Sequence, residues 1–111
     1  MIQGVGIDLV EIERIQDWYT KRPEMVNKIL TKDELNIFNK IKLESRKIEF
    51  ISGRFAVKEA FSKAMGTGMV KSTVFTRLIV YQMKMGNQKS FVKAIVFILP
   101  LHTRNIMQKP L

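Results

Sequence analysis

Asp8 is the first candidate for chemistry, because it is an acid inside the apolar and glycine-rich stretch Gly-Val-Gly-Ile-Asp-Leu-Val. Its ordinary interpretation is a helix N-cap, since Asp8 and Glu11 have the spacing of a capping box. A carboxylate that caps a helix has a second oxygen, which could still bind a cation. From the residues alone, both interpretations of Asp8 stay open.

Glu59 and Lys63 are a second candidate, with Arg54, Lys58 and Ser62 on an adjoining stripe of the same segment. Glu59 and Lys63 are four residues apart, so their ordinary role is an ion pair along a helix, worth about 0.2–0.5 kcal/mol. The stripe is by default a solvated helix face.

Other catalytic signatures are weak. His102 is the only histidine, and it lacks the partners that a metal site or a catalytic triad would need. The Gly-Thr-Gly at residues 66–68 is too short to indicate a Walker loop or a dinucleotide fingerprint.

The elements that must position these side chains are clearest in the first half. Apolar residues on both faces, together with two glycines, predict a strand from Ile2 to Leu9. Roughly helical spacing predicts a helix from about Val10 to Thr20, stopped by Pro23. A capping box formed by Thr31 and Glu34 predicts the start of another short helix.

The segment from about Glu44 to Met65 gives the strongest helix prediction, with Gly66 as its stop signal. Beyond it, β-propensity predicts strands at Phe75 to Met83 and Phe91 to Leu99, but neither alternates cleanly.

Composition predicts one small domain, because 46% of the 111 residues are hydrophobic. The absence of cysteine excludes disulfides and thiolate metal sites and favours a reducing compartment. No apolar run approaches the roughly 20 residues of a membrane span, and the N-terminus has no basic region or cleavage site of a signal peptide. We therefore expect a mature cytoplasmic protein.

The net charge of +9 is unevenly distributed. Residues 1–68 contain 12 Lys and Arg and all 10 Asp and Glu, whereas residues 69–111 contain 7 Lys and Arg and no acid. Such a basic segment could bind nucleic acid or an acidic partner. One possible function is therefore that of a small non-enzymatic basic protein that binds such a partner through its tail; we keep it as the alternative to an enzyme.

The wording and order of three motifs resemble the bacterial holo-acyl-carrier-protein synthases, the small 4′-phosphopantetheinyl transferases. These motifs are GIDLVEIERI, ILTKDE and GRFAVKEAFSKAMGTG, and the resemblance covers residues 1–68. It implies transfer of the 4′-phosphopantetheine arm of coenzyme A to a serine of apo-acyl-carrier protein, releasing adenosine 3′,5′-bisphosphate. It also implies a small α+β domain that forms a homotrimer with active sites at subunit interfaces.

The resemblance assigns roles residue by residue. Asp8 and Glu59 match the Mg²⁺ ligands, which fits an ion that takes only one or two protein carboxylates. Glu59 and Lys63 are the catalytic candidates, and Lys63 would contact phosphate. Coenzyme A, the co-substrate, would also meet Lys58 and the loop glycines Gly66 and Gly68. The general base is not identified; a metal-bound or Glu59-held water is the candidate.

Positive charge from the first helical region would meet the acidic carrier protein and raise the encounter rate. Arg14 is the main candidate for this surface, with Lys21, Arg22 and Lys28 as further candidates. Neither a nucleic acid nor a membrane is expected as a partner.

After Gly68 the resemblance stops in this reading frame. The family would continue with a Gly-Lys turn, an Asn-Glu-x-Gly-Lys-Pro-like segment and a final Ser-His-Thr strand. These motifs become possible in another reading frame, in which each codon joins the third base of one present codon to the first two bases of the next. In that frame Met69 to Lys71 permits Gly-Lys, Gln82 to Lys89 permits an Asn-Glu-Asn-Gly-Lys-Pro-like segment, and Leu101 to Pro110 permits Ser-His-Thr. The alternative to a shifted frame is a genuinely divergent basic tail.

We therefore interpret residues 1–68 as the N-terminal half of the synthase domain and residues 69–111 as an out-of-frame tail. On this hypothesis the C-terminal half of the sheet is doubtful, and the chain as written is expected to be inactive.

Overall fold

The computed structural model describes residues 2, 4–66, 76–86 and 90–100 of the chain. Its elements, in chain order, are β1 (Gly4–Glu11), α1 (Ile12–Lys21), the 3₁₀ turn η1 (Pro23–Met25), α2 (Val26–Ile29), α3 (Lys32–Lys40), α4 (Glu44–Met65), β2 (Thr76–Met85) and β3 (Phe91–Pro100). This mixture of helices and one sheet confirms the predicted α+β class.

The three strands form one antiparallel sheet in the order β1-β3-β2. The last strand of the chain is therefore central, and its Ala94 lies opposite Asp8 on β1 and Gln82 on β2. The first and last strands of the described chain pair directly, so β1 depends on the acid-free segment for its hydrogen bonds.

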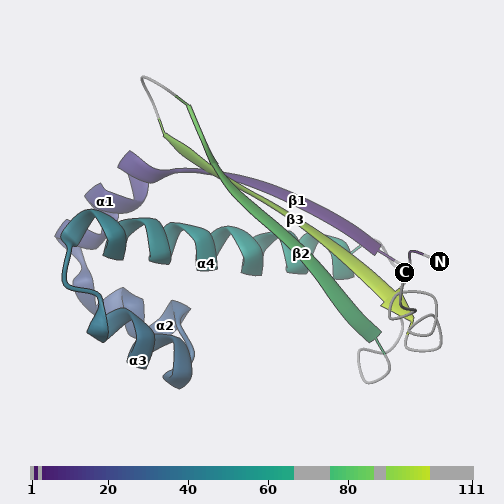
Figure 1. The fold of residues 1–111 in the computed structure, drawn as a ribbon, viewed down its shortest axis with the longest axis horizontal. Coiled ribbons are helices and arrows are strands. Elements are labelled where there is room, and N and C mark those ends of the chain that lie inside the picture. Colours follow the sequence, from purple (N-terminus) through teal and green to yellow (C-terminus); the bar gives the residue numbers. More distant parts are fainter. Residues whose placement is uncertain (1, 3, 67–75, 87–89, 101–111) are drawn as a thin grey trace, which may run out of the picture.

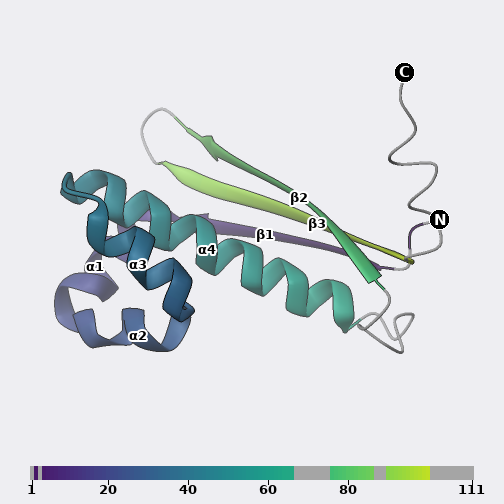
Figure 2. The ribbon, with the colours of Figure 1, turned by 60° about the horizontal axis from the view of Figure 1, so that its bottom comes forward.

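Helix α4 lies along one face of this sheet (Figure 1), and α1, α2 and α3 gather around the end where α4 begins. Turning the molecule shows the sheet and α4 as two layers (Figure 2), and among the described elements no helix covers the other face of the sheet. The long helix thus contacts both the sheet and the small helices.

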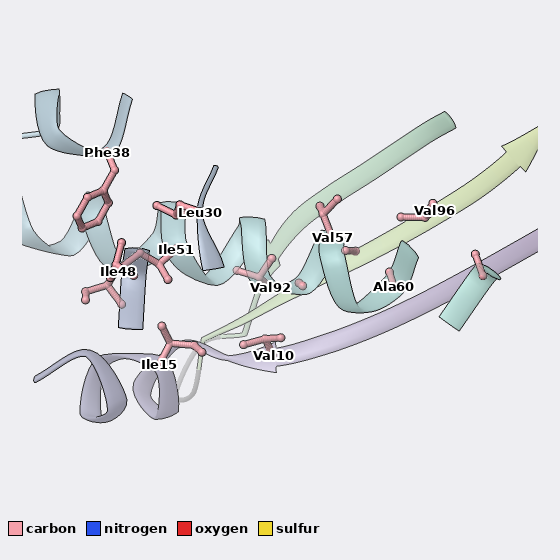
Figure 3. Packing of buried hydrophobic residues seen from close by; sticks show 14 of the residues in the cluster. Val10, Ile15, Leu30, Phe38, Ile48, Ile51, Val57, Ala60, Val92 and Val96 are labelled. Atoms are coloured by element: carbon pink, nitrogen blue, oxygen red, sulfur yellow. The ribbon is translucent and has the colours of Figure 1, made fainter. Parts of the chain in front are cut away.

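The core forms between these layers, where side chains of β1, β3 and α1 meet those of α4 (Figure 3). Alternate residues of β3, from Val92 to Ile98, point into it. Ser52 is the buried polar residue of α4, and its hydroxyl donates to the Ile48 carbonyl over 2.7 Å. Eight residues of α4 are buried, because the helix contacts both the sheet and the small helices: Ile48, Ile51, Ser52, Gly53, Ala56, Val57, Ala60 and Ala64.

Gly6 allows β1 to lie directly on α4. A Cβ atom at this position would be only 1.7 Å from the Ala60 carbonyl oxygen and 2.7 Å from the Ala64 nitrogen. Both are backbone atoms of a helix and cannot move aside cheaply. The small residues on the two elements therefore fix the height of β1 above α4, and with it the position of Asp8.

Two predictions from local sequence are confirmed. The long helix spans Glu44–Met65 as predicted, and Gly66 follows it with a right-handed φ of −72°. The capping box is also present, because the Thr31 amide donates to Glu34 Oε1 over 2.8 Å and the Glu34 amide donates to Thr31 Oγ1 over 3.2 Å.

The helix N-cap interpretation of Asp8 is wrong. Strand β1 continues through Glu11, which lies opposite Phe91, and α1 begins only at Ile12. The N-cap of α1 is Glu11, without a side-chain capping hydrogen bond. Pairing with β3 therefore extends the strand through the residues that the spacing assigned to a helix.

The doubt about the C-terminal half of the sheet is also corrected by the structure. The two predicted strands are present, and β3 alternates cleanly in burial from Phe91 to Ile98. Its pattern looked irregular in the sequence because the residues facing away from α4 include the apolar Phe91, Ile95 and Phe97.

The sheet face turned away from α4 is apolar and exposed. On β1 it presents Val5, Ile7 and Leu9, of which Leu9 is 56% exposed. Across the sheet, Leu9 lies opposite Lys93 of β3, and Lys93 lies opposite Met83 of β2. The prediction that β1 would be apolar on both faces is therefore right, but only one face is covered within the chain.

Within the described part of the chain, no helix combines the length and the apolar character needed to cross a membrane.

Candidate functional site

Asp8 lies near the C-terminal end of β1, on the face turned toward α4. Its side chain is 13% exposed, because it shares this face with Gly6 and Val10, which are buried. Strand pairing with Ala94 fixes its backbone. The carboxylate is thus held rigidly at the edge of the sheet, where α4 passes.

Lys63, in the last turn of α4, reaches Asp8. Its Nζ lies 2.9 Å from Asp8 Oδ1 and 3.4 Å from the Ile7 carbonyl oxygen. The hydrogen bond to Asp8 raises the pKa of Lys63 above its usual value, and the charges of Asp8 and Glu59 add to this effect. The simple Glu59–Lys63 pair of the helix is therefore replaced by a pair that joins α4 to β1, with Glu59 close enough to contribute its charge.

A cavity of about 490 Å³ opens beside this pair. Both Asp8 and Glu59 line it, together with Arg14. The rest of its wall is mostly apolar and comes from β1, α1, η1, α2 and α4: Leu9, Val10, Glu11, Ile15, Trp18, Met25, Ile29 and Phe55. The cavity therefore offers an apolar wall for an uncharged chain and two carboxylates that can bind a cation.

Mg²⁺ fits this donor set. The ion prefers carboxylate oxygens and keeps several positions for water and phosphate, so one or two protein ligands suffice. Asp8 already accepts from a cationic group, the Lys63 ammonium, whose pKa also responds to Glu59. The fields of the two carboxylates thus meet at a position suited to positive charge. Among the described residues there is no cluster of three or more His, Cys, Asp or Glu side chains that could hold a metal.

Glu34 forms a second charged cluster, between α3 and α4. Its two carboxylate oxygens accept from Arg54 Nε over 2.7 Å and from Lys58 Nζ over 2.8 Å. Burial alone would raise the pKa of Glu34, but hydrogen bonds from Lys58, the Thr31 amide and Arg54 outweigh it and lower the pKa to about 2. The Arg54 and Lys58 stripe is thus engaged by α3, and its interpretation as a merely solvated face is wrong.

The predicted carrier-protein residues lie on the small helices. Arg14 is exposed and also lines the cavity, so it belongs both to the cavity wall and to the predicted carrier-protein surface. Lys21, Arg22 and Lys28 are exposed at the end of α1, in the turn after it and on α2. These four basic side chains are exposed on the same elements as the acids Glu13, Asp17 and Glu24, so the surface carries charges of both signs.

Of the two predicted loop glycines, Gly66 directly follows α4, one residue after Met65. Gly68, His102 and the segments Met69 to Lys71 and Leu101 to Pro110 lie outside the described residues.

Two features of the site were missed in the sequence. Glu34 was interpreted only as a capping residue, although an acid buried by a second element would also attract the Arg54 and Lys58 stripe. Trp18 and Phe55 also line the cavity, and no local pattern in the sequence sets these two aromatic residues apart from the core residues of their helices.

Comparison with known proteins shows the family of the chain. Residues 4–103 match the family model described as the 4′-phosphopantetheinyl transferase superfamily. Over 106 residues, the chain is 48% identical to the holo-[acyl-carrier-protein] synthase of Staphylococcus aureus (strain Newman), covering 95% of this chain and 89% of that protein.

Solved structures show the same fold. A holo-(acyl-carrier-protein) synthase from Bacillus anthracis str. Ames, in complex with CoA (3′,5′-ADP), matches with a TM-score of 0.61 and 32% identity, covering 89% of this chain and 98% of that chain. The acyl carrier protein synthase of Plasmodium yoelii with ADP bound matches with a TM-score of 0.73 and 20% identity, covering 90% and 96% of the two chains. At that identity the second match shows the fold alone.

The sheet, the long helix and the family match together define a small transferase of the phosphopantetheinyl class. Within that class, the chain belongs to the holo-acyl-carrier-protein synthases.

Proposed function

We propose that the site transfers the 4′-phosphopantetheine group from coenzyme A to a serine hydroxyl of an apo-acyl-carrier protein. One observation carries this proposal: Asp8 and Glu59, from different elements, line the same cavity beside the Lys63 ammonium. The B. anthracis relative, which is 32% identical, was solved in complex with CoA (3′,5′-ADP). This supports coenzyme A as the phosphopantetheine donor.

The reaction would form a bond between the serine oxygen and the coenzyme A phosphorus that carries the pantetheine arm. It would break the bond from that phosphorus to the oxygen of the leaving adenosine 3′,5′-bisphosphate. The Lys63 ammonium would bind the phosphates and stabilise their negative charge. The apolar wall around Trp18 and Phe55 would contact the pantetheine arm. A metal-bound water or a water held by Glu59 would accept the serine proton.

We propose Asp8 and Glu59 as the protein ligands of Mg²⁺. The ion would supply positive charge that stabilises the charge developing on the phosphate oxygens. Lys58, the neighbour of Glu59 in the sequence, is paired with Glu34 and would add positive field from there. Gly66 and Gly68 would lie against the nucleotide.

The exposed sheet face supports a homotrimer. A contiguous apolar surface of this kind is typical of an interaction site, and Val5, Ile7, Leu9, Met83 and Met85 all contribute to it. The acidic carrier protein would instead meet Arg14, Lys21, Arg22 and Lys28 on the helical layer. We propose a cytoplasmic location, where coenzyme A and carrier protein are both available.

We further propose that residues 69–111 are read out of frame and that the chain as written has low activity. The support is compositional, since all ten acids precede residue 69. The family match runs through residue 103, so the expectation that the resemblance stops at Gly68 is wrong.

Transfer of labelled phosphopantetheine from coenzyme A to apo-carrier protein tests the proposed function. The assay requires a frame-restored chain, because low activity is expected of the chain as written. We expect Asp8→Asn or Glu59→Gln to reduce transfer at least about 100-fold at limiting Mg²⁺ with the circular dichroism spectrum unchanged. Ser62→Ala, an exposed position on α4, is the matched control. Full activity of either carboxylate variant would reject the assignment.

A further inference from the structure

The Asp8–Lys63 contact joins a rigid partner to a movable one. Asp8 is on a paired strand that lies against α4 at Gly6, and only 13% of its side chain is exposed. Lys63 extends from the last turn of α4, and 58% of its side chain is exposed. A change at this contact is therefore expected to move Lys63 and to leave Asp8 in place.

The contact also places two cations in competition for the same oxygen. Lys63 Nζ is 2.9 Å from Asp8 Oδ1, which is within the distance of a charge-assisted hydrogen bond. A divalent cation that used this carboxylate would meet the ammonium charge at close range. Even in water, the repulsion between a divalent cation and an ammonium about 4 Å away is strong enough to lower the affinity for the cation at least about fivefold.

A phosphate anion would relieve this competition. The Lys63 ammonium is exposed enough to turn toward an anion at the cavity mouth, and the lysine stem has several rotatable bonds. Each phosphate contact that Lys63 made would weaken its hold on Asp8. Coenzyme A carries such phosphates next to the arm that is transferred.

We propose that Lys63 is a positioning residue that occupies Asp8 until coenzyme A is bound. This inference rests on the proposed function, because it takes Asp8 as a metal ligand and coenzyme A as the phosphate donor. Its consequence is that a divalent cation binds weakly to the free chain and more tightly in the presence of coenzyme A. By linkage, the cation strengthens coenzyme A binding by the same factor.

Direct bonds between the metal and the phosphates would also couple the two ligands, so the decisive measurement is made without coenzyme A. The full 111-residue chain is titrated with Mn²⁺, and free Mn²⁺ is followed by electron paramagnetic resonance. The variants are Lys63→Met and Lys63→Gln, with Lys47→Met as the matched control. Lys47 is on the same helix, and its ammonium lies 4.9 Å from the Phe38 ring centroid.

We expect either Lys63 variant to bind Mn²⁺ at least about fivefold more tightly than the wild type in the absence of coenzyme A. Lys47→Met removes the same net charge and should stay within about twofold, because that charge is screened. On adding coenzyme A, the gain in Mn²⁺ affinity should be smaller for the Lys63 variants than for the wild type.

Equal or weaker Mn²⁺ binding by both Lys63 variants without coenzyme A would overturn the proposal, while leaving the metal site itself intact. A different result identifies failure of the proposed function. If Asp8→Asn binds Mn²⁺ as well as the wild type, with and without coenzyme A, Asp8 is not a ligand and both proposals fall. Lys63 is more than half exposed, so its variants are expected to fold.

Discussion

Substitution of Glu34 by Gln tests the bridge between α3 and α4. The amide has nearly the same size and can still accept from the Thr31 amide, so the capping geometry is largely kept. It removes the negative charge that both Arg54 and Lys58 contact. The variant therefore separates the ion pairs from the capping box.

The size of the effect follows from the pKa of Glu34. Lowering it from 4.5 to about 2 corresponds to at most about 3 kcal/mol of stabilisation, at roughly 1.4 kcal/mol for each tenfold change in acidity. The Arg54 and Lys58 side chains are each 36% exposed, so water screens their charges and the net value is smaller. We expect Glu34→Gln to lower the free energy of unfolding by about 1–2 kcal/mol at pH 7.

The sign of the pH dependence provides a second check. Because the folded-state pKa lies below the ordinary value, the stabilisation is complete above about pH 4.5 and is lost as the pH falls toward 2. The difference between wild type and Glu34→Gln, measured by urea unfolding, should therefore shrink steadily from pH 5 to pH 2.5.

Glu49→Gln is the matched control, because Glu49 also pairs with a lysine, Lys84, but is 33% exposed. It should change stability by less than about 0.5 kcal/mol. If Glu34→Gln is no more destabilising than this control, or if its effect does not depend on pH, the Glu34 cluster does not stabilise the fold as argued.

Three further predictions concern other contacts. Gly6→Ala should lower the unfolding free energy by about 3 kcal/mol or more in urea, since its Cβ would be 1.7 Å from a backbone oxygen. Gly66→Ala, whose nearest contact would be 3.4 Å, should change it little, and equal losses would contradict the argument. Arg14→Glu should weaken carrier-protein binding more than coenzyme A binding in calorimetry, and equal losses would remove Arg14 from the docking surface. In the frame-restored chain, Leu9→Lys should lower the oligomer mass measured by light scattering if the exposed sheet face is the subunit interface; an unchanged mass would exclude that face.

The features predicted correctly from the sequence depend on neighbouring residues. The capping box at Thr31 and Glu34 involves positions three residues apart. Helix α4 has its stop signal at its own end, in Gly66. Such patterns need no knowledge of the rest of the chain.

The features that were missed depend on distant residues. Asp8 has the spacing of a helix cap, but pairing with Ala94 of β3 keeps it in a strand. Glu34 meets Arg54 and Lys58, which are 20 and 24 positions away. No local pattern specifies those partners. The Asp8–Lys63 pair spans 55 positions, and the motif resemblance indicated both residues without indicating that they touch.

The exposed sheet face shows a further limit of one chain. Apolar residues on both faces of β1 indicated a strand covered on both sides, yet Val5, Ile7 and Leu9 are exposed here. The pattern is therefore consistent with the proposed homotrimer, in which a second copy would cover this face.

That face also makes the reading-frame hypothesis testable by assembly. The described residues of the acid-free segment form strands, so the hypothesis no longer predicts loss of the sheet. Lys93 of β3, however, is on the exposed face between Leu9 and Met83. Burying a lysine in an apolar contact between subunits is costly unless a carboxylate pairs with it.

We therefore expect the chain as written to assemble poorly and to convert apo-carrier protein to the holo form slowly, although it retains Asp8 and Glu59. Sequencing the gene around codon 69 tests the hypothesis directly, and restoring one base there should recover a trimer and carrier-protein modification together. Light scattering measures the first, and the mass of the carrier protein measures the second. Lys93→Met in the uncorrected chain should restore assembly, because it removes the charge that would be buried between subunits. It should not restore activity, because the in-frame residues of the second half are still missing. If the uncorrected chain is already a stable trimer that modifies carrier protein at an ordinary rate, residues 69–111 are a genuine solution to the same fold and the reading-frame hypothesis is wrong.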